Sequence, residues 1–110
     1  MVLVDTSNWV ELLRASGRPD VQKRMRHLLQ QGQAAWCMMV RIELWNGAGS
    51  DRDIRHLRDL EILVPSLEIN DAVWRTGLDF ARRARGKGWS IPANDLLIAA
   101  CAAHHKVKIE

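Results

Sequence analysis

The chain opens with MVLVDTS, residues 1–7, a short apolar run that stops at a carboxylate and two hydroxyls. Three consecutive apolar residues, Val2 to Val4, predict a strand buried on both faces, as in the middle of a parallel sheet. Asp5 then stands at the carboxyl end of that strand, where open α/β sheets bind their ligands. Taken alone, Asp5 is better explained as a cap of the next helix, because its side chain can accept hydrogen bonds from free N–H groups. Its companions along the chain decide between the two interpretations.

The composition describes one globular domain. The chain has 110 residues, of which 47% are hydrophobic, enough for a single core. Its longest apolar run, residues 96–103, is too short to cross a bilayer, and no basic segment precedes a long apolar stretch as in a secretory signal. Cys37 and Cys101 have apolar neighbours and no metal-type spacing, which predicts small buried side chains in a reducing compartment. We therefore expect a cytoplasmic protein without a membrane segment.

The charge is mildly basic and unevenly distributed. A formal net charge of +3 and a pI near 9.3 permit nucleic-acid binding without requiring it. Residues 82–87 hold Arg82, Arg83, Arg85 and Lys87, and residues 23–26 form a smaller basic group. A solvated helix face and a patch that contacts phosphates explain such runs equally well.

Apolar spacing predicts alternating helices and strands in the first half of the chain. Helices are expected over residues 7–15 and from Pro19 to Gly32, where the glycine ends the second one. Residues 34–39 form an apolar run of strand length, and residues 39–48 and 51–61 show helical spacing.

The second half continues the alternation. Residues 62–64 are expected to form a short buried strand closed by Pro65. A helix capped by Asn70 or Asp71 should run to Gly86. Its expected packed face is Val73, Trp74, Gly77, Leu78 and Ala81. A buried helix over 96–103 and a last strand from residue 107 complete a parallel sheet covered on both faces.

Three carboxylates occupy comparable points in this pattern. Asp5 follows the first strand, Glu43 lies in the helix after the second, and Asp95 begins the buried helix. A parallel sheet brings such positions to one rim, so the three acids can converge. Converging carboxylates repel one another, and raised pKa values or a bound divalent cation relieve the repulsion. Oxygen ligands favour Mg²⁺ or Mn²⁺ over zinc, and such a metal can activate water for phosphodiester cleavage.

Each acid also has a structural explanation, since carboxylates near a helix start are favoured by the helix dipole. Other phosphate chemistries fit poorly. A haloacid-dehalogenase-type site needs a second Asp two positions after the first, where Ser7 stands, and no phosphate-binding loop is present. His104 and His105, near a helix end, are better explained as surface residues than as metal ligands.

Three segments resemble the signatures of one family: VLVDTSNW at 2–9, RIEL at 41–44 and NDLLIAA at 94–100. Together they are similar to PIN-domain toxins, the VapC-type ribonucleases of bacterial toxin–antitoxin pairs. The resemblance implies a three-layer α/β/α sandwich around a parallel sheet and cleavage of RNA by a Mg²⁺- or Mn²⁺-dependent endoribonuclease. It also implies a homodimer and inhibition by a cognate antitoxin that wraps the toxin. By the motif matches, Asp5, Glu43 and Asp95 would be the catalytic, metal-binding carboxylates, with Thr6 or Ser7 as polar support near Asp5.

One departure from the family leaves alternatives open. Family members usually carry a further Asp just past the last strand, whereas this sequence ends at Glu110, which matches no family motif. We therefore expect a single PIN-like domain over residues 1–110 that ends before the usual acidic segment. An inactive binding module that still engages the antitoxin is the main alternative, and a nuclease directed at DNA would share the same metal chemistry.

Overall fold

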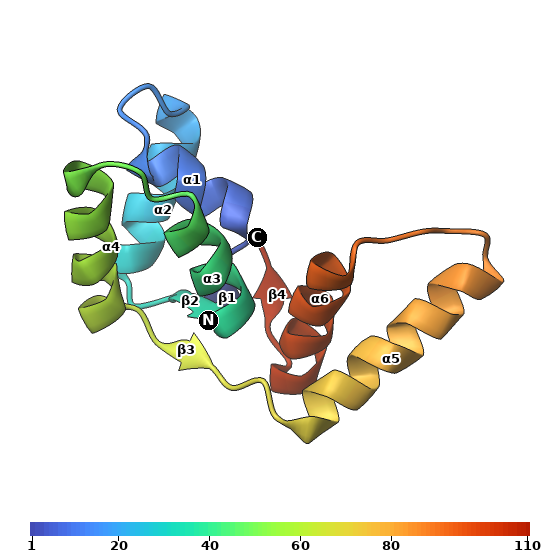
Figure 1. Cartoon of the computed structure of the whole chain (residues 1–110). Coiled ribbons are helices and arrows are strands. Elements are labelled where there is room, and N and C mark those ends of the chain that lie inside the picture. Colours follow the sequence, from blue (N-terminus) through green and yellow to red (C-terminus); the bar gives the residue numbers. More distant parts are fainter.

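The computed structural model describes residues 1–110 and contains one sheet of four parallel strands (Figure 1). The strands are β1 (Val2–Leu3), β2 (Ala34–Cys37), β3 (Ser66–Leu67) and β4 (Lys108–Ile109). Their spatial order is β3-β2-β1-β4, and every neighbouring pair runs parallel. The predicted α/β class is confirmed, and β1 lies inside the sheet, so Asp5 follows an interior strand.

Six helices connect the strands: α1 (Thr6–Leu13), α2 (Pro19–Gln30), α3 (Met38–Asn46), α4 (Asp51–Leu63), α5 (Asp71–Gly86) and α6 (Ala93–His105). Two of them begin with the side-chain caps that their sequences provide. Ser50 accepts a hydrogen bond from the Asp53 N–H at 3.1 Å, and Asn70 accepts one from the Val73 N–H at 3.0 Å. These caps satisfy free N–H groups and fix where α4 and α5 start.

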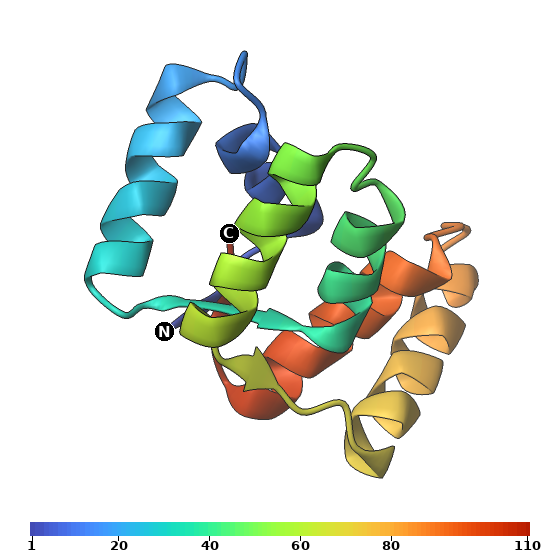
Figure 2. The same ribbon diagram turned by 60° about the vertical axis from the view of Figure 1, so that its left-hand side comes forward.

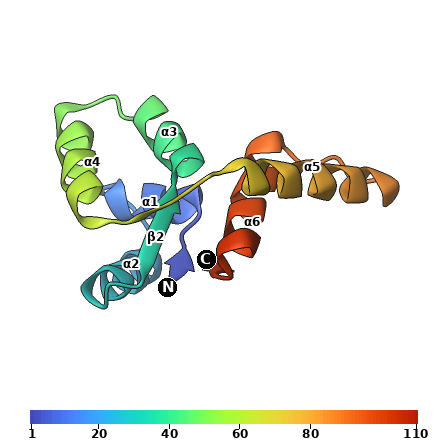
Figure 3. The same cartoon turned by 90° about the horizontal axis from the view of Figure 1, so that it is seen from below.

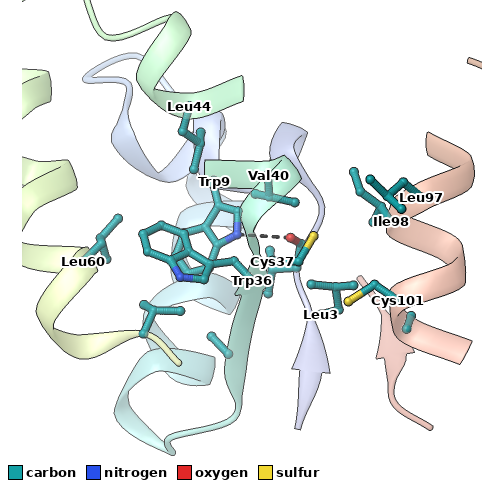
Figure 4. Packing of buried hydrophobic residues seen from close by; sticks show 14 of the residues in the cluster. Leu3, Trp9, Trp36, Cys37, Val40, Leu44, Leu60, Leu97, Ile98 and Cys101 are labelled. Carbon is teal, nitrogen blue, oxygen red and sulfur yellow. Dashed lines mark hydrogen bonds between the residues drawn. The ribbon is translucent and has the colours of Figure 1, made fainter. Parts of the chain in front are cut away.

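The core lies on both sides of the strands, as a three-layer α/β/α sandwich requires (Figure 4). On one side Trp9 of α1 packs against Trp36 of β2, with ring centroids 5.3 Å apart. The Trp9 indole N–H donates to the Val4 carbonyl at 3.1 Å, so this buried polar group is satisfied. On the other side, Ile98 and Cys101 of α6 face the sheet. The buried run of β2 therefore packs against both layers.

Helix α5 lies beside α6 at one end of the molecule (Figure 2). Seen from below, α6 lies between the sheet and α5, which is outermost (Figure 3). The molecule is consequently elongated, 42 × 25 × 24 Å. The predicted packed face of α5 is correct for Val73 but wrong for Trp74 and Leu78, which are 55% and 68% exposed. Helix α5 has only α6 to pack against, so a single narrow stripe of it is covered.

The predicted strand at residues 62–64 is wrong. Ile62 and Leu63 belong to α4, are 89% and 63% exposed, and are followed by β3 only after Pro65. Short apolar runs suit a helix end as well as a strand, and here the helical pattern of α4 continues through them. The other predicted elements are present with shifts of a few residues at their ends, except that β1 and β4 are shorter and α6 starts three residues earlier. None of the helices combines the length and apolar character needed to cross a bilayer.

Candidate active site

Asp5 links β1 to α1, and its carboxylate does not cap the helix. Its backbone N–H donates to the Glu110 carbonyl at 2.7 Å, and its own carbonyl accepts from the Asn8 N–H at 3.1 Å. It is the N-cap residue of α1, yet its side chain makes no capping hydrogen bond. The Ser7 hydroxyl instead donates to the Asp5 carboxylate at 3.0 Å. The interpretation of Asp5 as a side-chain cap is therefore wrong, and the expected support from Ser7 is present.

Glu43 is held by hydrogen bonds from two other helices. The Thr6 hydroxyl of α1 donates to Oε1 at 3.0 Å, and the Asn94 amide of α6 donates to Oε2 at 3.0 Å. Glu43 is half-buried, so these charge-assisted bonds are partly shielded from water. Because Thr6 directly follows Asp5, the bond also brings Glu43 to the carboxyl end of β1. Thr6 thus supports Glu43, whereas the sequence suggested support of Asp5.

Asp95 lies in the first turn of α6, as predicted, but it is exposed and faces α5. It lines a cavity of about 260 Å³ together with Arg83, Lys87 and Trp89. Its position in a first turn is also the one that the helix dipole favours. The residue that reaches Glu43 is its neighbour Asn94.

The candidate ligands Asp5 and Glu43 are carboxylates, and oxygen ligands suit a hard cation such as Mg²⁺ or Mn²⁺. However, no group of three His, Cys, Asp or Glu residues lies close enough together to hold a metal ion. The three-acid site therefore stays a prediction.

Asn94 is the site residue that sequence reasoning missed. It stands within the segment that carries Asp95, but an amide next to a carboxylate gave no signal of its own. The available signal was its place one residue into a helix that begins at the sheet rim. A residue there can turn toward the preceding strands while Asp95, the next residue along, faces another direction.

The remaining candidates have structural partners. The Arg24 guanidinium forms two hydrogen bonds to the Glu110 carboxylate, at 2.8 and 3.0 Å, and this holds the pKa of Glu110 below its usual value. The His105 imidazole lies 2.8 Å from the Glu68 carbonyl, and that of His104 lies 3.3 Å from the Asn70 amide. Both histidines therefore belong to the surface, as predicted.

Both cysteines are free and buried, also as predicted. Burial is the main cause that raises the pKa of the Cys101 thiol to about 12, and the neighbouring Cys37 adds to it. At neutral pH Cys101 is thus an uncharged apolar group rather than a nucleophile.

The fold is a parallel α/β/α sandwich with acidic side chains at the carboxyl ends of its strands. Comparison of the chain with known protein families shows which class of protein has this combination. The PIN domain model matches residues 2–109, so the chain belongs to the PIN-domain family.

Relatives of known name match almost the whole chain. The ribonuclease VapC11 of Mycobacterium tuberculosis and the VapC ribonuclease Mb1587 of Mycobacterium bovis are each 37% identical to it over 113 residues. The alignment covers 99% of this chain and 84% of each relative.

Solved structures share the fold. VapBC2 of Rickettsia felis, crystallised with a DNA fragment from its promoter, aligns with a TM-score of 0.78 and 19% identity, covering 99% of this chain and 85% of that one. VapBC-1 of nontypeable Haemophilus influenzae aligns with a TM-score of 0.75 and 25% identity, covering 99% and 84%.

Proposed function

We propose that this chain is a metal-dependent endoribonuclease toxin that cleaves RNA phosphodiester bonds and is neutralised by a cognate antitoxin. The observation that carries the proposal is the 37% identity, over 99% of the chain, to proteins named as VapC ribonucleases. The rim of the sheet supports it, because Glu43 accepts a hydrogen bond there from Thr6, the residue that follows Asp5.

In this proposal Asp5 and Glu43 hold Mg²⁺ or Mn²⁺, and Asp95 completes the set. Such an ion would steady the charge that develops on the phosphate and lower the pKa of the attacking water. Thr6 and Asn94 fix both oxygens of Glu43, and Ser7 fixes one oxygen of Asp5. Ligands that are already oriented lose less conformational freedom when they bind an ion.

The test is cleavage of structured RNA by the purified chain with Mg²⁺ or Mn²⁺. EDTA and the nearly isosteric variants Asp5→Asn and Glu43→Gln should each abolish cleavage, while circular dichroism shows a folded protein. Ser66→Ala, in β3, is the matched surface control and should cut like the wild type. Metal-independent cutting, or full activity of Asp5→Asn, would show that the proposed centre is wrong.

One observation favours the alternative of an inactive PIN-fold binding module. The three predicted acids do not form a group able to hold a metal in this arrangement, and Asp95 faces α5. A module of this kind would bind the antitoxin but leave RNA intact under every metal condition. Competition between RNA and single-stranded DNA as substrates separates the endoribonuclease from a nuclease directed at DNA.

The antitoxin and the homodimer are part of the same proposal. Support comes from exposed apolar side chains beside a cavity of about 410 Å³ between α3, β3 and α5. Met38, Ile42 and Trp74 line it and are 48%, 54% and 55% exposed. Analytical ultracentrifugation of wild type and Ile42→Glu tests whether this surface joins two copies, since a buried charge there would dissociate a dimer.

A further inference from the structure

The surface between the end of α5 and the start of α6 carries two aromatic rings, two cations and an acid around one cavity. The cavity measures about 260 Å³, and Phe80, Arg83, Lys87, Trp89, Ile91 and Asp95 line it. None of these residues contributes to the hydrogen bonds around Asp5 and Glu43. Their combination nonetheless suits a ligand that is both flat and negatively charged.

Trp89 carries the exposed aromatic ring of this surface. The backbone at the end of α5 determines where this residue lies. Gly88 adopts a left-handed φ of +77°, its N–H donates to the Arg85 carbonyl at 3.0 Å, and the Trp89 N–H donates to the Ala84 carbonyl at 2.8 Å. This pair of bonds is the Schellman ending of a helix, which needs glycine at the left-handed position. The backbone of Trp89 is thus fixed at the end of α5, and its side chain is 56% exposed.

Two cations line the cavity beside Trp89. The Lys87 ammonium is 5.2 Å from the centre of the Trp89 ring and forms no ion pair. Arg83 is paired only with Asp79 at 2.9 Å, a surface pair that a phosphate can replace at little cost. Arg82 and Arg85 on the same turns are exposed as well.

The geometry points to a nucleotide-binding pocket in which Trp89 stacks on an unpaired base of single-stranded RNA while Lys87 and Arg83 contact its phosphates. The inference rests on the proposed function for the choice of RNA. Stacking on an exposed aromatic side chain requires a base with a free face, which a duplex does not offer. Asp95 borders the same cavity, so a bound strand would pass beside the rim of the site.

Charge decides against an apolar protein segment as the occupant. Two of the lining side chains are cations, and the exposed neighbours on α5 add further positive charge. An apolar partner would remove water from Lys87, which forms no ion pair in the structure even though Asp95 lines the same cavity, and this is costly. A phosphate backbone supplies that charge directly.

The test is binding of a fluorescently labelled single-stranded RNA of about ten nucleotides, measured by anisotropy in EDTA so that no cleavage occurs. Trp89→Ala should weaken binding by about 5- to 100-fold, the loss typical of one stacked base, and Trp89→Phe should recover most of it. Trp45→Ala is the matched control, because Trp45 is also an exposed tryptophan, at 36%, and does not line this cavity. Lys87→Gln should lower the dependence of affinity on salt.

The pocket is refuted if Trp89→Ala binds like the wild type, if Trp45→Ala loses as much affinity, or if the wild type does not bind or prefers duplex RNA. Its failure can be told apart from that of the proposed function. Wild-type cleavage with Mn²⁺ and an unchanged KM in Trp89→Ala would remove the pocket and leave the nuclease. RNA binding that depends on Trp89, without cleavage under any metal condition, would support the pocket and refute the nuclease.

Discussion

Replacing Asn94 by Asp tests the contact that organises the candidate site. In the structure the Asn94 amide donates to Oε2 of Glu43 at 3.0 Å. Asn94→Ala removes this charge-assisted hydrogen bond, and the free energy of unfolding should fall by about 1.5–3 kcal/mol, the usual net value for a hydrogen bond to a charged group. Asn94→Asp removes the same bond and also places a second carboxylate against Glu43.

The size of the additional effect follows from Coulomb's law. Two like charges about 4 Å apart repel by about 1 kcal/mol in water and by about 4 kcal/mol at the effective dielectric constant near a protein surface. Both residues are half-buried, so we expect a cost of about 2 kcal/mol beyond that of Asn94→Ala. For a domain of this size the midpoint of thermal unfolding would fall by a further 8–16 °C or so.

The cost should depend on pH with a defined sign. Repulsion raises the folded-state pKa of one carboxyl in the new pair above its unfolded value. The destabilisation is therefore absent below the unfolded pKa, near 4, and grows as the pH rises toward the raised folded pKa. A divalent cation that binds between the carboxylates would offset it at neutral pH.

Urea unfolding in EDTA at pH 7 and pH 4, with Asn94→Ala as the control, measures both effects. A Mn²⁺ titration at pH 7 then compares wild type and Asn94→Asp. Equal stability of the two variants at pH 7 would show that Asn94 does not lie against Glu43. A gap of the same size at pH 4 would show that the loss has a cause other than charge.

Three further predictions concern the frame around the site. Arg41 of α3 forms a bidentate ion pair with Glu61 of α4, and both side chains are about one quarter exposed. A double-mutant cycle with alanine should give a coupling energy of about 1 kcal/mol. A coupling energy near zero would contradict the contact. Lys106 ends α6 with a left-handed φ of 56°; Lys106→Gly should raise the free energy of unfolding by about 0.5–1 kcal/mol in urea titrations, whereas any loss would mean that its side chain matters. The pKa of the Cys101 thiol is raised to about 12, so this thiol should resist Ellman's reagent at pH 8 until the protein unfolds. The free energy of unfolding should also fall as the pH rises from about 9 toward 12, because only the thiol of the unfolded chain ionises in that range. Rapid labelling of Cys101 in the folded chain would refute this.

The parts of the fold that the sequence predicted are those set by local pattern. Val2 to Val4 form a run that only a buried strand explains well, and Asp5 follows it at the rim. Residues 62–64 failed because three apolar residues suit either a helix end or a strand. Strand β3 forms at Ser66 and Leu67 instead, since those residues pair with β2, about 30 residues earlier, and no local pattern encodes that pairing.

The sequence predicted which types of residue form the candidate site, but it predicted less well in which direction each side chain points. Glu43 lies at the carboxyl end of β1, next to Thr6, because the topology brings strand ends and helix starts to one rim. Asp95 and Asn94 are adjacent in sequence, and only the rotation of α6 about its axis determines which of them faces Glu43. Trp74 failed for a related reason, since helical spacing predicts an apolar face but does not say whether another element covers it.

The pairing of β1 with β4 has a consequence for how the protein is made. Val2 pairs with Lys108, and the N–H of Asp5 is satisfied by the carbonyl of Glu110. At about 5–20 residues per second, roughly 5–20 s of translation separate the first strand from its last neighbour. During that interval one edge of β1 stays open, and such edges are prone to pair with other chains. A ribosome that pauses before it has translated β4 therefore holds a chain in which the N–H of Asp5 still lacks the carbonyl of Glu110 as its partner.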